Sequence, residues 1–274
     1  MKTLTPIFCL LILAARVSAE TLPADEAGVI AFFQERGDRI TLNDEGHAVK
    51  LFSSGKPELS VAELQVIGKL THLEELALNS AKAGDDDWGF LQELKQLRLI
   101  RIWHGHHFSS LAPFAGIPAE DVLFGGCMGL RDLNKDDPDQ LRNAVLTLRD
   151  LPNVKTLTLY HSPLTPDDSH LAHLVAEFPG LTDLRVDFAA PRGQEVKITP
   201  EGLARLAKLK LTRFAIENAE ALTPKHLAAL AEIKTLENLH IYPPRTGEFD
   251  HEPLLAELKQ LRPNLKITFQ EQPK

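Results

Sequence analysis

The residues of this sequence that could do chemistry are few, and the densest group is a run of histidines beside a tryptophan, Trp103-His104-Gly105-His106-His107. Imidazole nitrogens bind transition metals, and zinc needs ligand atoms that converge to about 2.0–2.1 Å from the ion. Adjacent residues such as His106 and His107 need not converge on one point, so we interpret the run as a polar turn. The alternative hypothesis is a metal-dependent enzyme that uses the cluster from His104 to His107.

Other patterns of catalytic or ligand-binding residues are absent from the sequence. It holds no glycine-rich phosphate loop and no G-x-S-x-G nucleophile motif. The acidic runs Asp85-Asp86-Asp87 and Asp136-Asp137 are typical of helix starts, where carboxylates interact favourably with the helix dipole. We expect Cys127 to be a small buried residue and not a nucleophile. The sequence therefore favours a protein that is not an enzyme and that uses no metal or cofactor.

The elements that must position these residues are indicated by an internal repeat. Each copy has three apolar residues, with two other residues after the first and one after the second. Six copies fit closely: Leu73-Leu76-Leu78, Leu97-Ile100-Ile102, Val154-Leu157-Leu159, Leu181-Leu184-Val186, Leu211-Phe214-Ile216 and Leu236-Leu239-Ile241. Ala119-Val122-Phe124 fits more loosely. Successive copies begin 24, 22, 35, 27, 30 and 25 residues apart, and the longest interval holds an insertion around residues 129–138.

Each copy predicts a strand, and most of the intervals predict an amphipathic helix after it. Ser60-Val61-Ala62-Glu63 has the form of a capping box that begins a helix. Threonine followed by proline, as at Thr165, Thr199 and Thr223, is typical of an N-cap before the first helical residue. Because one strand and one helix cannot bury their own apolar faces, such units must stack on one another.

The ends of the chain differ from the repeat. Lys2, an apolar run at residues 7–15 and the small residues of Val17-Ser18-Ala19 are typical of a secretory signal peptide, which we expect to be cleaved after Ala19. We therefore divide the chain into a signal peptide (1–19), an N-terminal cap (20–45), a repeat region (46–269) and a polar tail (270–274). The cap is expected to contain a helix at 24–34, and a hairpin is expected to join strands at 40–42 and 48–51. A last strand is expected at 265–269.

The repeat resembles that of leucine-rich-repeat proteins, in particular exported bacterial ones with units of the form L-x-x-L-x-L-x-x-T-x-I-T-D. The closest match is VKTLTLYHSPLTPDD at residues 154–168. The resemblance implies an α/β solenoid, a horseshoe with a parallel sheet on its concave face and helices on its convex face. It says almost nothing about function, because this fold serves many unrelated partners. The asparagine of many such families is missing, and Cys127 stands at one of its positions.

The strand register brings aromatic residues and glycines to neighbouring strand ends. Trp103-His104 and Tyr160-His161 are expected to flank Gly125-Gly126, with one strand spacing on each side. The two spacings amount to about 9–10 Å, which suits a ring held between two aromatic walls. We therefore predict a ligand-binding slot formed by Trp103, His104, Gly125, Gly126, Tyr160 and His161, although the glycines could instead only make a turn.

The sequence as a whole favours a binding module over an enzyme. The net charge of −8 argues against nucleic acid or an anionic membrane as the partner. No integral membrane segment is expected after signal cleavage, and the protein would be periplasmic, on the cell surface or secreted. We expect a protein or glycan partner on the concave face. A structural component of the envelope without a discrete ligand is a further alternative.

Overall fold

Ten strands form a single sheet in this protein. The computed structural model describes residues 22–127, 144–161, 167–188, 197–219, 222–242 and 252–269. The strands follow one another across the sheet in chain order. β1 and β2 are antiparallel, and all later neighbours are parallel. The strands are β1 (Arg39–Leu42), β2 (Ala48–Ser53), β3 (Glu75–Asn79), β4 (Leu99–Trp103), β5 (Asp121–Gly125), β6 (Thr156–Tyr160), β7 (Asp183–Asp187), β8 (Arg213–Glu217), β9 (Asn238–Ile241) and β10 (Lys266–Phe269).

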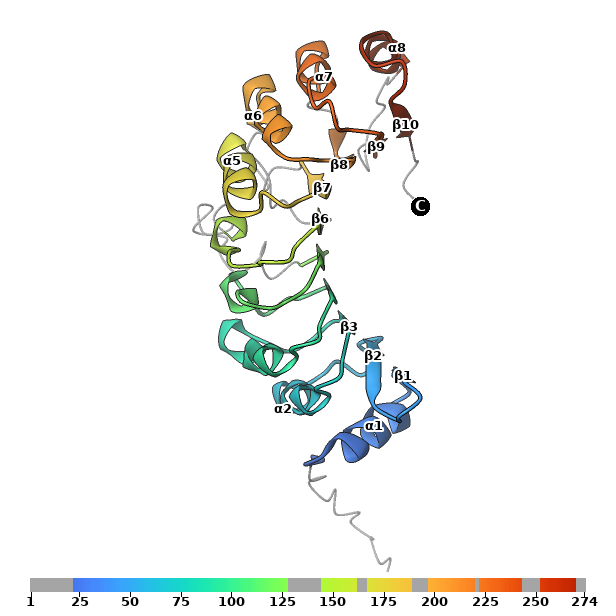
Figure 1. The fold of residues 1–274 in the computed structure, drawn as a ribbon. Helices are drawn as coiled ribbons and strands as arrows, with labels where there is room; N and C mark the ends of the chain where they lie inside the picture. The colour runs from blue at the N-terminus through green and yellow to red at the C-terminus, as the bar shows by residue number, and fades with distance from the viewer. Residues whose placement is uncertain are drawn as a thin grey trace, which may run out of the picture.

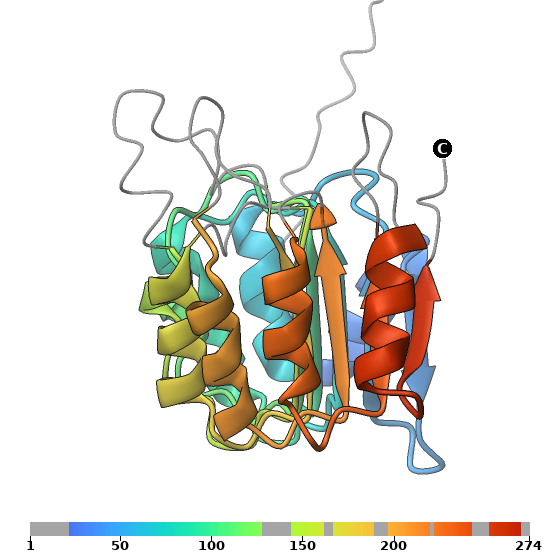
Figure 2. The same ribbon diagram turned by 90° about the horizontal axis from the view of Figure 1, so that it is seen from above.

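The helices lie on one side of this sheet, which confirms the expected α/β arrangement. Figure 1 shows the strands along the inner side of an arc and the helices along its outer side, and Figure 2 shows the helices side by side. The α-helices are α1 (Glu26–Glu35), α2 (Val61–Val66), α5 (Asp168–Glu177), α6 (Pro200–Ala204), α7 (Pro224–Ala231) and α8 (Glu252–Leu261). The 3₁₀-helices are η1 (Ile67–Lys69), η2 (Asp85–Glu93), η3 (Ala112–Phe114), η4 (Val145–Thr147) and η5 (Arg205–Lys208). Among the helices described, none is long and apolar enough to cross a membrane.

The connections of the first half differ from the amphipathic α-helices expected there. The intervals of 24 and 22 residues contain the 3₁₀-helices η2 and η3, whereas the intervals of 27, 30 and 25 residues contain α5, α6 and α7. A 3₁₀-helix rises about 2.0 Å per residue, compared with about 1.5 Å in an α-helix. Because a 3₁₀-helix covers more length per residue, a short interval between two strands can cross the helical layer with fewer residues.

Most of the predicted helix starts are confirmed. The capping box at Ser60 is complete, with Glu63 N–H donating to Ser60 Oγ at 3.3 Å and Ser60 N–H donating to Glu63 Oε2 at 2.7 Å. Thr199 and Thr223 are the N-caps of α6 and α7. Helix α5 begins later than predicted, because Asp167 is its N-cap and accepts a hydrogen bond from Ser169 N–H. Thr165 itself lies outside the described residues.

The core lies between the sheet and the helices. The apolar residues of all seven repeat copies are buried there, among them Leu157 at 0% exposed. Cys127 is buried as well, as expected, and burial raises the pKa of its thiol to about 12. The opposite side chains of each strand form the inner face of the sheet. Thr158 lies on that face but is only 7% exposed. Its neighbours in register are Leu123 and Arg185, so this inner-face position is more enclosed than alternation alone suggests.

Candidate functional site on the inner face

The sheet brings a row of unlike side chains together where its parallel strands end. We call this the strand-end row, and it consists of the last residue of each strand from β3 to β8 and the residue after it. Its members are Asn79-Ser80, Trp103-His104, Gly125-Gly126, Tyr160-His161, Asp187-Phe188 and Glu217-Asn218. The register places neighbours of the row beside one another, for example Trp103 beside Gly125 and Gly125 beside Tyr160. Tyr242 takes the corresponding place directly after β9.

The second residue of most of these pairs has a left-handed backbone. Ser80, His104, Gly126, His161 and Asn218 have φ between 52° and 60°, a conformation that side chains other than glycine seldom adopt. The chain therefore leaves the sheet by the same sharp turn after five of the strands. This repeated turn fixes where the strand-end side chains stand.

The first half of the row is an aromatic surface on β4. The Trp103 side chain is half-buried and meets Phe52 of β2 edge-on, with ring centroids 6.5 Å apart. His104 Nδ1 lies 2.6 Å from Asn79 Oδ1, which holds the imidazole in place. That imidazole lies against Gly126, because a Cβ built on Gly126 would be only 3.1 Å from His104 Cδ2. The space above Gly126, which the sequence predicted as part of the ligand-binding slot, is therefore occupied by the His104 ring.

The structure brings together only part of the predicted slot. Gly125 lies beside Trp103 and Tyr160 in register, as predicted, but the side chain of Tyr160 is outside the described part of the chain. His161 does not face the glycines: its Nε2 atom lies 3.5 Å from Glu217 Oε2 on β8, two strands away. The second wall of the slot therefore stays a prediction.

The histidine cluster around His104 is spread out. The rings of His104 and His106 are 6.1 Å apart, and His107 Nε2 lies 3.8 Å from Glu58. Within the described ranges, one group of three or more His, Cys, Asp or Glu side chains has its ligand atoms within 4.8 Å of one another, and it consists of Glu26, His47 and His72. Those residues lie near the N-terminal end, away from the strand-end row.

The second half of the row contains buried charge that we did not select from the sequence. The Glu217 side chain is 0% exposed and pairs with Arg185 of β7, whose Nε donates to Glu217 Oε1 at 2.8 Å. Asp187, 2% exposed, accepts a hydrogen bond of 2.5 Å from Asn218. The Arg185 guanidinium also lies over the ring of Tyr242, 4.4 Å from its centroid. We call Arg185, Asp187, Glu217 and Tyr242 the carboxylate cluster.

The carboxylate cluster contains a carboxyl group, that of Glu217, whose pKa is raised. Burial raises the pKa of Glu217, the Arg185 charge opposes that rise, and the Asp187 charge adds to it. The Oε2 atom of Glu217 is buried, and His161 Nε2 lies 3.5 Å from it. Groups with raised pKa values are concentrated at functional sites. The one sequence signal for this cluster was two acidic residues at equivalent positions of adjacent strands.

Exposed ion pairs join neighbouring strands on the inner face of the sheet, away from the strand-end row. Directly before β5 and β6, Glu120 and Lys155 form such a pair at 3.1 Å. Lys50–Glu75, Arg101–Asp121 and Arg213–Asp183 form as well, at 2.6, 3.3 and 2.6 Å. No family model and no curated protein matches this sequence.

Proposed function

We propose that this protein is an exported leucine-rich-repeat binding module that recognises a protein or glycan partner on the inner face of its sheet. A ten-stranded sheet in chain order, with helices on the other face, supports the horseshoe solenoid that the sequence repeat predicts. The recognition surface is the strand-end row together with the inner-face side chains beside it.

The observation that carries this proposal is the aromatic surface at Trp103. Phe52, Leu99, Leu123 and Trp103 are all only half-buried and lie on the face that no described helix covers. Tryptophan contributes strongly to binding because it buries a large area and keeps a polar tip. Since His104 is fixed by Asn79 and the Trp103 ring meets Phe52, a partner would not have to order them first, which reduces the entropic cost of binding.

The carboxylate cluster suits the same role. Glu217 Oε2 can accept a hydrogen bond from a hydroxyl or an amide, and sugars and polypeptides both offer such donors. Access to that atom requires neighbouring side chains such as His161 to move aside, because the side chain of Glu217 is fully covered and His161 Nε2 lies 3.5 Å from Oε2. The aromatic surface would then make the first contact.

A capture experiment tests the proposal. Purified protein is used to isolate a partner from the native envelope fraction, and Kd is then measured for the wild type, Trp103→Ala and Tyr160→Ala. We expect Trp103→Ala to weaken binding by about thirtyfold, the effect of losing about 2 kcal/mol at an interface hot spot. Lys208→Ala, an exposed change on the helical side, should leave Kd unchanged. Digesting the fraction with protease or with glycosidases separates a protein partner from a glycan.

Two results would contradict the proposal. If Trp103→Ala and Tyr160→Ala both stay folded and keep full affinity, the strand-end row is not the site. Mass analysis of exported material is the second check, because the mature chain should begin at Glu20. A retained Met1 in the exported protein would refute the predicted cleavage.

A further inference from the structure

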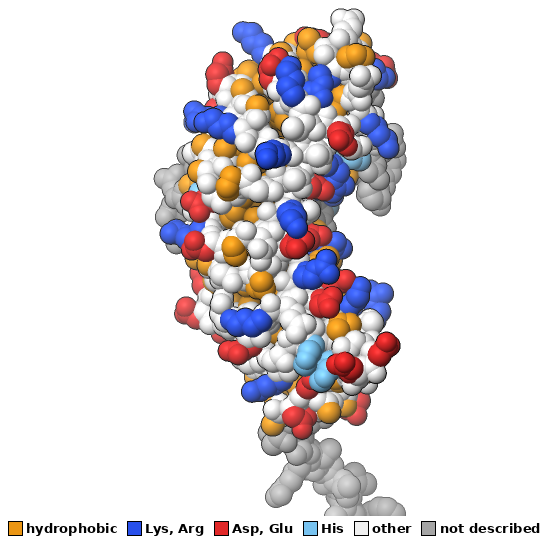
Figure 3. All heavy atoms as spheres, in the orientation of Figure 1, with side chains coloured by type: hydrophobic (Ala, Val, Ile, Leu, Met, Phe, Trp, Pro, Cys, Tyr) orange, Lys and Arg blue, Asp and Glu red, His pale blue; other side chains and the backbone are white. Residues whose placement is uncertain are grey.

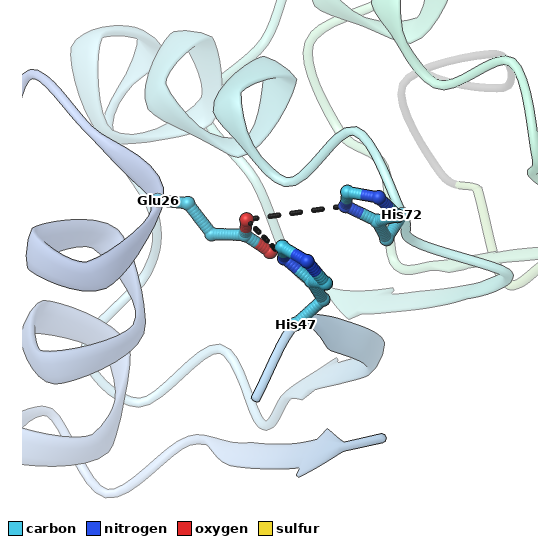
Figure 4. A group of neighbouring side chains, drawn as sticks. All are labelled: Glu26, His47 and His72. Carbon is cyan, nitrogen blue, oxygen red and sulfur yellow. Dashed lines mark hydrogen bonds and ion pairs between the residues drawn. The ribbon is translucent and has the colours of Figure 1, made fainter. Parts of the chain in front are cut away.

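Three side chains from separate segments meet near the N-terminal end of the molecule. Glu26 is the first residue of α1, His47 directly precedes β2, and His72 lies in the turn before β3. Figure 4 shows the carboxylate and both imidazoles pointing toward one another. Figure 3 shows histidine side chains reaching the surface at this end, beside acidic ones. The residues are 21 and 25 positions apart in sequence, so no short motif reveals them.

The donor atoms are close to the spacing of a metal site. Glu26 Oε2 lies 2.9 Å from His47 Nδ1 and 3.9 Å from His72 Nδ1, and the three ligand atoms are all within 4.8 Å of one another. Donors bound to a tetrahedral zinc ion at about 2.0–2.2 Å lie about 3.3–3.5 Å apart. Completing the coordination therefore requires shifts of about 1 Å or slightly more in the side chains. It also requires one imidazole to turn, because the two rings are stacked with centroids 3.8 Å apart and planes 20° apart, and a bound ion must lie near the plane of each ring.

One of the three ligand atoms, His72 Nδ1, is buried without a hydrogen-bond partner among the described residues. Such burial is unfavourable for a polar nitrogen. A metal ion beside Glu26 would satisfy that atom. The carboxylate is already oriented, because its other oxygen accepts the Ala48 N–H at 3.0 Å, and such outer hydrogen bonds hold ligands in productive positions.

Glu26 is not needed to cap its helix. Asp25 is the N-cap of α1 and accepts the Gly28 N–H at 2.8 Å. The Glu26 carboxylate instead turns toward the two histidines. Its side chain is 22% exposed and those of His47 and His72 are each 36% exposed, so the group lies close to the surface.

We propose that Glu26, His47 and His72 form a binding site for a divalent transition metal such as zinc. Two imidazoles and one carboxylate suit zinc, copper or nickel, whereas calcium and magnesium prefer oxygen ligands alone. The bound ion links α1, the start of β2 and the turn before β3. It therefore fastens the N-terminal cap to the first parallel strand, independently of any partner on the inner face.

Zinc titration of the untagged protein, after treatment with EDTA, tests this site. We expect the wild type to bind one equivalent of zinc and to have a higher melting temperature with zinc than without it. Cobalt bound at the same site should give the visible absorption spectrum of a four-coordinate ion. Removing an outer-shell partner weakens metal sites about 10- to 100-fold, so Glu26→Gln, His47→Gln and His72→Gln should each weaken zinc binding at least 100-fold. His107→Gln is the matched control, because His107 is half exposed and lies near Glu58 instead.

His72→Gln is the decisive variant, because His72 Nδ1 has no hydrogen bond to lose. In EDTA it should melt within a few degrees of the wild type, so that lost zinc binding reports on coordination and not on folding. The proposal is overturned if the wild type binds no zinc, if His72→Gln binds it as tightly as the wild type, or if only His107→Gln loses it.

Discussion

The two halves of the inner face share one backbone arrangement and differ in what their side chains leave uncovered. Across β2 to β5, Phe52, Leu99, Leu123 and Trp103 stand half-buried. Across β7 to β9, Arg185 instead covers Glu217 and reaches over to Tyr242. The comparison teaches that the same strand positions provide an apolar contact surface in one half and a closed charged cluster in the other.

The ion pairs of the two halves differ in the same way, because one pair is exposed to solvent and the other is largely buried. The Arg101 and Asp121 side chains are 40% and 31% exposed, and such exposed pairs contribute about 0–1 kcal/mol. The Arg185 and Glu217 side chains are 24% and 0% exposed. Losing one partner of a buried pair leaves an uncompensated charge, so the two pairs should respond very differently to mutation.

The largest expected effect is therefore at Arg185. Arg185→Ala should lower the free energy of unfolding by about 3–5 kcal/mol, because Glu217 would keep a buried charge without its counterion. Arg101→Ala, on the open half, should cost no more than about 1 kcal/mol. Urea denaturation of both variants measures the difference. Equal losses would show that the two halves are not electrostatically distinct.

A core variant on the strand between the halves should have a comparable or slightly smaller effect. Leu157 of β6 is 0% exposed, and Leu157→Ala should lower the free energy of unfolding by about 2–5 kcal/mol through the cavity it leaves. Thr156→Ala, at a partly exposed inner-face position, should stay within about 0.5 kcal/mol. Similar losses at Leu157 and Thr156 would mean that the register of β6 is wrong.

The position of the His104 ring over Gly126 can be tested by mutating the glycine. Gly126→Ala should cost about 1–2 kcal/mol, because φ is +60° and the new Cβ would approach the His104 ring at 3.1 Å. Gly89→Ala, with no atom within 4 Å of its Cβ and no positive φ, should be nearly neutral. A neutral Gly126→Ala would show that His104 is free to leave this position.

The smallest expected effect is a pH dependence of opposite sign at two carboxylates. A carboxyl group whose pKa is raised on folding holds its proton longer in the native state. Its contribution is therefore present at acid pH and is lost as pH rises through the folded pKa. Glu217 has such a raised pKa. Glu217→Gln should thus gain stability relative to the wild type above pH 4.5, with a slope of at most about 1.4 kcal/mol per pH unit.

Glu63 provides the contrast. Burial raises the pKa of Glu63, but hydrogen bonds from Ser60 and the Arg36 charge outweigh it, and the net pKa is lowered. Its contribution is present above pH 4.5 and is lost as pH falls through the folded pKa. Glu63→Gln should therefore lose stability relative to the wild type as pH rises from the folded pKa to about 4.5, and the deficit should stay constant above that pH. Thermal melts of both variants from pH 3 to pH 8 measure the two signs, and trends of the same sign would contradict this assignment.

Sequence patterns predicted the fold well because burial is periodic. The apolar triplets gave the strands β3 to β9, and the capping residues Ser60, Thr199 and Thr223 gave three helix starts. The 3₁₀ character of η2 and η3 was missed, since it follows from how many residues remain to cross the layer. Four predictions concern residues outside the described ranges: the signal peptide, the insertion around 129–138, the helix start at Thr165 and the polar tail at 270–274.

The site was predicted only in part, because contacts across strands depend on rotamers. The sequence placed Trp103 beside Gly125, yet it could not show that His104 would turn over Gly126 or that His161 would turn toward Glu217. The group of Glu26, His47 and His72 was invisible for a different reason. Its members come from a helix, a hairpin and a turn that only the packed cap brings together.

The repeated left-handed turn limits how this surface could be re-engineered. A combinatorial library built on the strand-end row can vary a final strand residue that is not fully buried, such as Trp103, over the whole amino-acid alphabet. The next position must keep φ near +55° at Ser80, His104, Gly126, His161 and Asn218. Valine, isoleucine and threonine resist that geometry, and glycine, asparagine and aspartate accept it. At each strand, a library would therefore vary the final strand residue widely and limit the next residue to the few types that accept a left-handed backbone.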